Sequence, residues 1–207
     1  MVNPFNVTNF TRSKKELEEF LLFCIVVAGK TAYIQAQKLD DFLQSIHKRL
    51  MMPDNCTPFQ IIKSADMHGI LLDELKKAKL GQYTKLFKSF QYIIENSLDL
   101  KKCMPSDLEK IPGVGMKSSR FFLLHSNDTL GKKICILDTH LLKFIRENID
   151  ETAPKSTPMN AKQYYYWENK LLDYCNKNNI ENLASFDLEI WKSYARKNKE
   201  VSFNEQT

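Results

Sequence analysis

The sequence has few helix-breaking residues and no apolar run long enough to cross a membrane. It contains 6 glycines and 7 prolines in 207 residues, and the alternating pattern of half-buried strands is scarce. The longest apolar run, Phe20 to Ala28, falls well short of the roughly 20 residues that a membrane span needs. The N-terminal residues also lack the charged, apolar and small segments of a signal peptide. We expect an all-α, cytoplasmic protein, or a nuclear one in a eukaryote.

The cysteines lack any pattern that would hold a metal or build a disulfide framework. Their number, 5, is odd, they are scattered, and no two are spaced as Cys-x-x-Cys. Cys24, Cys135 and Cys175 have apolar neighbours and are predicted to be small buried residues. We expect no metal and no cofactor.

The charge is only mildly one-sided, with 30 basic and 25 acidic side chains and a net charge of +5. This excess permits binding to nucleic acid without requiring it. The spacing of apolar residues predicts helices over residues 13–28, 30–48, 59–65, 71–79, 83–96, 117–126, 139–148, 160–176 and 181–197. Ser106 and Glu109 are expected to form a capping box for a further short helix, and residues 127–133 to form a polar loop.

A glycine turn between two predicted helices is the most informative motif. In the run Leu108-Glu-Lys-Ile-Pro-Gly-Val-Gly-Met-Lys117, Gly113 and Gly115 allow positive φ and leave N–H groups exposed at the start of a helix. Ile111 and Val114 can pack inward. Such a turn can hold a backbone phosphate of a nucleic acid without reading its sequence, although glycine turns also serve as plain connectors. Gly113, Val114 and Gly115 are the candidate DNA contacts.

Lys117 lies in the first turn of the helix after these glycines. A single lysine in a basic chain is usually a solvated side chain. Here, however, the helix dipole and partial burial against Leu123, Leu124 and neighbouring phenylalanines would favour the neutral amine, which can attack carbon.

Asp138 precedes Thr139-His-Leu-Leu142 and, considered alone, is best explained as a helix N-cap. A capping aspartate stays ionised and can also turn its second oxygen toward a positive charge that develops nearby. The helix and loop after Lys117 can fold back, so both residues could reach one cleft.

The run Gly-Val-Gly-Met-Lys117 followed by Ile-Leu-Asp138-Thr-His resembles the signature of the helix-hairpin-helix DNA glycosylases. The iron–sulfur cysteines of endonuclease III are absent, and the loop before Asp138 is longer. These features, the run Ser119-Arg-Phe-Phe-Leu-Leu124 and the run Phe186-Asp-Leu-Glu-Ile-Trp-Lys192 are similar to the compact 8-oxoguanine DNA glycosylases.

This resemblance implies a two-lobed, all-α fold, with residues 1–30 and 138–207 in one lobe and 31–137 in the other. The helix-hairpin-helix would span about 105–126. Lys117 and Asp138 would be catalytic in a cleft between the lobes. Lys30, in a loop that wedges into the DNA, and His140 would contact DNA. Trp191 would stack on the base.

The implied activity is a base-excision-repair glycosylase with abasic-site lyase activity. The partner would be double-stranded DNA that contains a damaged base, the substrate an oxidised purine such as 8-oxoguanine, and the protein a monomer. Two alternatives stay open: an endonuclease III-like glycosylase for oxidised pyrimidines, and a non-catalytic helix-hairpin-helix module that docks other machinery onto DNA.

Overall fold

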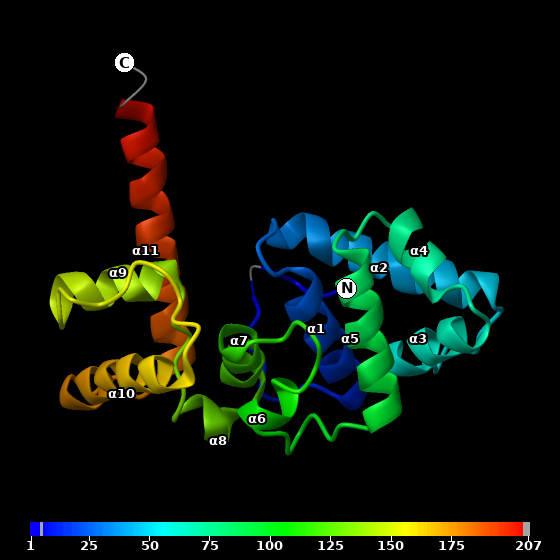
Figure 1. Cartoon of the computed structure of the whole chain (residues 1–207), viewed down its shortest axis with the longest axis horizontal. Helices are drawn as coiled ribbons and strands as arrows, with labels where there is room; N and C mark the ends of the chain where they lie inside the picture. Colours follow the sequence, from blue (N-terminus) through cyan, green and yellow to red (C-terminus); the bar gives the residue numbers. More distant parts are fainter. Residues whose placement is uncertain (5, 205–207) are drawn as a thin grey trace. The chain divides into compact units, whose positions relative to one another are not determined.

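The computed structural model describes the backbone of residues 1–4 and 6–204 and the side chains of residues 1–4 and 6–194. The described residues form helices and no strand (Figure 1). The chain divides into two compact units, Met1–Phe122 and Leu123–Thr207. The helices are α1 (Lys14–Val26), α2 (Ala32–Arg49), α3 (Pro58–Met67), α4 (Leu71–Lys77), α5 (Tyr83–Asn96), α6 (Pro105–Leu108), α7 (Met116–Ser126), α8 (Asp128–Gly131), α9 (Thr139–Asn148), α10 (Ala161–Lys177) and α11 (Leu183–Asn204).

The first unit is built around α1. Ser13 and Glu16 cap this helix: the Ser13 Oγ accepts from the Glu16 N–H (3.3 Å), and Glu16 accepts from the Ser13 N–H (2.8 Å). From Phe20 to Val26 every residue is buried, because α2, α3 and α5 pack around the helix (Figure 1). Phe20 also contacts Phe122 of α7, with ring centroids 5.6 Å apart. The apolar core of this unit therefore holds the middle of α7 against α1.

The second unit contains α9, α10 and α11. Phe144 of α9 joins them: its ring centroid lies 5.4 Å from that of Tyr174 on α10 and 5.4 Å from that of Phe186 on α11. Tyr164, Trp167 and Leu171 form the buried stripe of α10. None of the helices in the described part of the chain is long and apolar enough to cross a membrane.

The division into units differs from the lobes expected from the sequence. Residues 1–30 belong with residues 31–122, since α1 packs on α2, α3 and α5 and supplies much of their core. The boundary near residue 138 falls instead inside α7, between Phe122 and Leu123. The expected grouping of 1–30 with 138–207 thus does not describe these compact units.

Two local predictions were wrong. The helix expected at Ser106 begins at Pro105, and Asp107 rather than Glu109 accepts from the backbone N–H before it, that of Met104 (3.0 Å). Residues 127–133 were expected to be a loop but contain α8, which Asn127 caps by accepting from the Leu130 N–H (2.9 Å). Asp107 lies in the first turn of α6 and Asn127 directly before α8, so in both places an Asp or Asn side chain accepts from a backbone N–H at the helix start. A proline at the first position of α6 also favours the start of that helix.

Candidate active site

The glycine turn lies between α6 and α7 in the first unit. Gly113 has φ +82°, which a residue with a side chain rarely adopts. The Val114 N–H donates to the Ile111 carbonyl (2.9 Å), and both of these residues are buried. Val114 therefore packs the hairpin inward, whereas Gly113 and Gly115 are exposed.

Gly115 differs from the expectation that both glycines take positive φ. Its φ lies outside the left-handed region, and a Cβ built on it would meet nothing within 4 Å. Folding of the free protein thus gives no reason for glycine at this position. A group that approaches the backbone from outside the chain would need the space that the missing side chain leaves.

The start of α7 offers unpaired hydrogen-bond donors. Gly115 accepts the first bond of the helix, from Ser119 (3.0 Å). The N–H groups of Gly115, Met116 and Lys117 donate no hydrogen bond within the described residues of the first unit, as expected for a first helical turn. Together with the helix dipole, they form a site suited to an anion.

Two residues of α5 support this turn, and the sequence analysis missed both. Ser89 is fully buried, and its hydroxyl lies 2.5 Å from the Pro112 carbonyl, to which it donates. The stem of Lys85 crosses Gly113 so closely that a Cβ there would lie 2.0 Å from the Lys85 Cε. A signal for Ser89 existed, because it is a polar residue on the same helix face as Leu86, Phe90 and Ile93.

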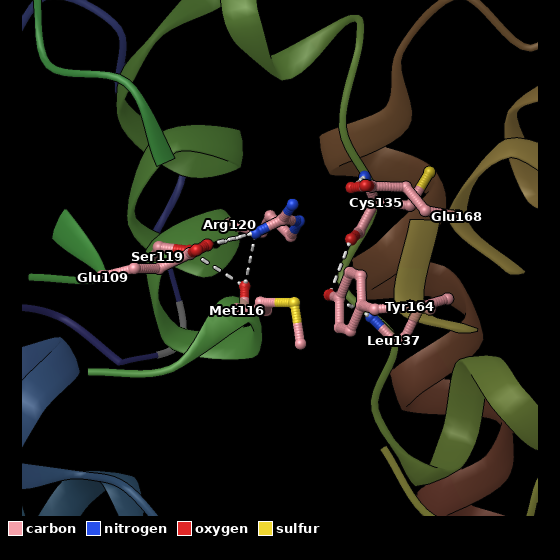
Figure 2. A network of polar contacts seen from close by, with 8 residues as sticks. All are labelled: Glu109, Met116, Ser119, Arg120, Cys135, Leu137, Tyr164 and Glu168. Atoms are coloured by element: carbon pink, nitrogen blue, oxygen red, sulfur yellow. Dashed lines mark hydrogen bonds and ion pairs between the residues drawn. The ribbon is translucent and has the colours of Figure 1, made fainter. Parts of the chain in front are cut away.

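A polar network fixes the first turn of α7 from the other side (Figure 2, left). Glu109 accepts from Arg120 (2.6 Å) and from the hydroxyl of Ser119 (2.8 Å). Arg120 is 1% exposed, and it also donates to the Met116 carbonyl (3.3 Å). Glu109, expected to cap α6, instead ties the link between the two hairpin helices to α7.

Lys117 lies in the first turn of α7, as predicted, but its side chain is exposed. The partial burial expected for it is therefore wrong. Among the apolar side chains of α7 that were expected to cover it, Phe122, Leu123 and Leu124 are themselves buried. An amine at this position is free to meet a large ligand.

The side chain of Lys30 folds back onto the backbone of residues 80–81. Its ammonium donates to the Leu80 carbonyl (2.6 Å) and lies 3.5 Å from where a Cβ on Gly81 would be. Burial, together with the positive charges of Lys38 and Lys85, lowers the pKa of Lys30. Its expected contact with DNA stays a prediction, and such a contact would require Lys30 to release this carbonyl.

Asp138 caps α9 in the second unit. Its Oδ1 accepts from the N–H groups of His140 and Leu141, each at 2.9 Å. The side chain is half-buried, and its Oδ2 accepts no hydrogen bond from the described residues of this unit. The cap predicted from the sequence is confirmed, and one carboxylate oxygen remains for another role.

His140 and Trp191 pack against each other across α9 and α11. Their ring centroids are 6.4 Å apart, with the planes at 83°. Trp191 is 52% exposed, which is unusual for so large an apolar side chain. The two residues share one surface, and their expected contacts with DNA and with the base stay predictions.

Three of the cysteines are buried thiols, as their apolar neighbours indicated. All 5 are free thiols, and Cys24, Cys135 and Cys175 are buried. Burial raises the pKa of Cys175 to about 11 and also raises that of Cys24 and Cys135. Thiolate chemistry at neutral pH is therefore disfavoured at these three positions.

Several solved structures share this fold. The 8-oxoguanine glycosylase/lyase of Methanocaldococcus jannaschii, solved in complex with DNA that contains 8-oxoguanine, is 23% identical, with a TM-score of 0.58, and the match covers 91% of this chain and 84% of that one. A second structure of the M. jannaschii glycosylase is 24% identical, with a TM-score of 0.58 and coverage of 92% and 83%. The 8-oxoguanine DNA glycosylase of Thermotoga maritima is 19% identical, with a TM-score of 0.57 and coverage of 90% and 83%. The fold is that of the helix-hairpin-helix DNA glycosylases.

The sequence identifies the family within this class. The family model described as Ogg-HhH, 8-oxoguanine DNA glycosylase, matches residues 1–180. The chain therefore belongs to the 8-oxoguanine DNA glycosylase family, whose members are base-excision-repair enzymes. A search of curated proteins finds no match.

Substitution of the two hairpin glycines should affect different properties: stability at Gly113 and DNA binding at Gly115. Gly113→Ala should lower the free energy of unfolding by roughly 1–2 kcal/mol, because alanine is strained at this φ and its Cβ meets Lys85. Gly115→Val should leave thermal stability nearly unchanged, since its space is open. It should weaken binding to damaged and undamaged duplexes alike, with little change in the salt dependence, because no cation is lost.

Thermal unfolding and fluorescence anisotropy with the two duplexes measure these effects. If Gly115→Val weakens binding to damaged duplex alone, the turn reads the lesion rather than the phosphate backbone.

Proposed function

We propose that the chain excises 8-oxoguanine from double-stranded DNA and cleaves the strand at the resulting site, with Lys117 as nucleophile and Asp138 as the electrostatic partner. One observation carries this proposal. In a member of this glycosylase family, an exposed lysine lies in the first turn of α7, beside backbone N–H groups suited to an anion, in the run whose sequence resembles the signature of these enzymes. The M. jannaschii relative, solved with DNA containing 8-oxoguanine, supports DNA with this lesion as the partner.

The hairpin would hold the duplex. The free N–H groups of Gly115 and Met116 suit a phosphate oxygen, and the Lys85 stem that crosses Gly113 brings a positive charge to the same turn. These contacts are independent of sequence. Because the glycosidic bond cannot be reached inside the base stack, the damaged nucleotide must leave the helix before it reacts.

Lys117 and Asp138 would then divide the chemistry. The Lys117 amine attacks C1′, so that a C–N bond forms as the bond to the base breaks, and the proton lost from the new C1′-bound nitrogen passes to the departing base. Asp138, whose Oδ1 caps α9 and whose Oδ2 accepts no bond from the described residues of its unit, would stabilise the positive charge that develops on the sugar. Opening of the sugar ring gives a Schiff base, and loss of a C2′ proton expels the 3′ phosphate by β-elimination. No step of this mechanism needs a cofactor. The enzyme would act in the compartment that holds the DNA, the cytoplasm or, in a eukaryote, the nucleus.

The lysine assignment predicts a covalent intermediate. Borohydride should reduce the Schiff base during turnover and trap a protein–DNA adduct that denaturing gels detect. Lys117→Ala should lose the adduct and strand cleavage, because no amine remains at this position. Lys102→Ala is the matched control, since Lys102 is another exposed lysine of the first unit, paired only loosely with Asp99 (3.9 Å), and it should trap normally. An adduct that persists in Lys117→Ala would overturn the assignment.

The two roles of Asp138 can be separated with one variant. Asn is as good an N-cap as Asp, so Asp138→Asn should change the free energy of unfolding by less than about 1 kcal/mol. The same change removes the negative charge and should lower single-turnover excision by about 100-fold or more. Activity that survives while thermal stability falls would reduce Asp138 to a cap.

The substrate assignment distinguishes the chain from enzymes that act on oxidised pyrimidines. 8-Oxoguanine differs from guanine chiefly by a protonated N7 and a C8 carbonyl. A pocket with one acceptor facing N7–H would leave that acceptor unpaired against guanine, at a cost of about 1–3 kcal/mol. We expect single-turnover excision to be faster from a duplex with 8-oxoguanine than from one with thymine glycol at the same position. The reverse order would favour an endonuclease III-like specificity, and no excision of either would favour a non-catalytic DNA-binding module.

A further inference from the structure

The segment that leads into Asp138 is buried but is neither helix nor strand. Residues Ile134 to Leu137 are all buried, and no other segment of the described chain pairs with them as a strand. Their backbone N–H and C=O groups therefore lack the ladder that normally satisfies them. Buried backbone groups of this kind need other partners.

Side chains of α10 supply these partners (Figure 2, right). The Tyr164 hydroxyl accepts from the Leu137 N–H (3.1 Å) and donates to the Cys135 carbonyl (3.1 Å). One turn later, Glu168 accepts from the Cys135 N–H (3.0 Å). Tyr164 is 0% and Glu168 4% exposed, so these bonds are shielded from water, and α10 takes the place of a neighbouring strand.

The same segment is held again at its last carbonyl. The Thr157 hydroxyl donates to the Leu137 C=O (2.7 Å), which belongs to the peptide group joining Leu137 to Asp138. Tyr164 and Thr157 thus hold the residue before Asp138 at both its N–H and its C=O. On the far side, Oδ1 of Asp138 is held by the first turn of α9. Backbone and side chain together set the direction of the remaining oxygen, Oδ2.

We propose that Tyr164 is a positioning residue for Asp138. It does not touch the substrate; through Leu137 it fixes where the carboxylate stands. This inference rests on the catalytic role proposed for Asp138, because a charge that stabilises a developing positive charge acts only from the right place, and a displacement of about 1 Å can cost roughly 100-fold in rate. Phenylalanine would fill the same space, but it cannot bridge the Leu137 N–H and the Cys135 carbonyl.

The test compares Tyr164→Phe with Tyr165→Phe. Tyr165 is the next residue of α10 and is 47% exposed. Single-turnover excision of 8-oxoguanine, with saturating enzyme, should fall about 10- to 100-fold in Tyr164→Phe and stay unchanged in Tyr165→Phe. The affinity for duplex, measured by anisotropy, should be the same in both, since the buried side chain of Tyr164 leaves no surface for a ligand. Circular dichroism at the assay temperature establishes that each protein is folded.

A double variant separates positioning from general damage to the fold. If Tyr164 acts through the Asp138 carboxylate, Tyr164→Phe should cause little further loss in an Asp138→Asn background. An equal loss in both backgrounds would overturn the proposal, as would a folded Tyr164→Phe with the wild-type rate. If Asp138→Asn alone keeps full activity, the proposed function of Asp138 fails instead, whatever Tyr164→Phe does.

If Tyr164→Phe does not fold, Thr157→Val tests the same proposal, because it removes the other hydrogen bond to Leu137. Thr157 lies in a loop and is half-buried, and valine preserves its shape without the hydroxyl. We expect a smaller loss in excision, in the same direction and again absent in the Asp138→Asn background. A wild-type rate for Thr157→Val in this case would count against the proposal.

Discussion

The site depends on one constraint: backbone polar groups that are buried outside helices must find hydrogen-bond partners. Two non-helical segments carry the candidate chemistry, and side chains from neighbouring helices satisfy each of them. Ser89 of α5 donates to Pro112 in the glycine turn. Tyr164 and Glu168 of α10 bond to the segment before Asp138. Without these partners, neither segment would keep its conformation in an apolar interior.

The hydrogen bonds also separate the groups that hold the structure from the donors and acceptors that remain available to a ligand. In the turn, the Val114 N–H is used within the hairpin, whereas those of Gly115, Met116 and Lys117 have no partner in their unit. At Asp138, Oδ1 caps α9 and Oδ2 is left over. In each segment, hydrogen-bonded groups fix the backbone conformation, and the groups next to them that make no hydrogen bond remain available for binding or chemistry. A site that must bind phosphate and stabilise charge needs hydrogen-bond donors and acceptors that are free for the ligand and held by a rigid backbone.

Local signals in the sequence were sufficient for much of the fold. The predicted helices over 83–96 and 139–148 and the Asp138 cap each depend on residues within one or two turns, and all are confirmed. Predictions failed where several local partners competed. Asp107, not Glu109, bonds ahead of α6, and Asn127 starts a helix in an expected loop. The burial of Lys117 was also wrong, because periodicity along a helix does not say how far its first turn projects from the core.

By itself, the sequence determined the all-α class, the glycine turn with its lysine, the aspartate cap and the family to which they belong. These follow from residue identity and short spacing, since caps, turns and helix faces form between near neighbours. Tertiary structure alone decided that Arg120 and Glu109 lock the hairpin, that Lys85 crosses Gly113 and that Tyr164 supports the segment before Asp138. Those partners are 11 to 29 residues apart in the chain. Only packing brings them together, because hydrogen bonds depend on distances of about 3 Å that no sequence spacing specifies.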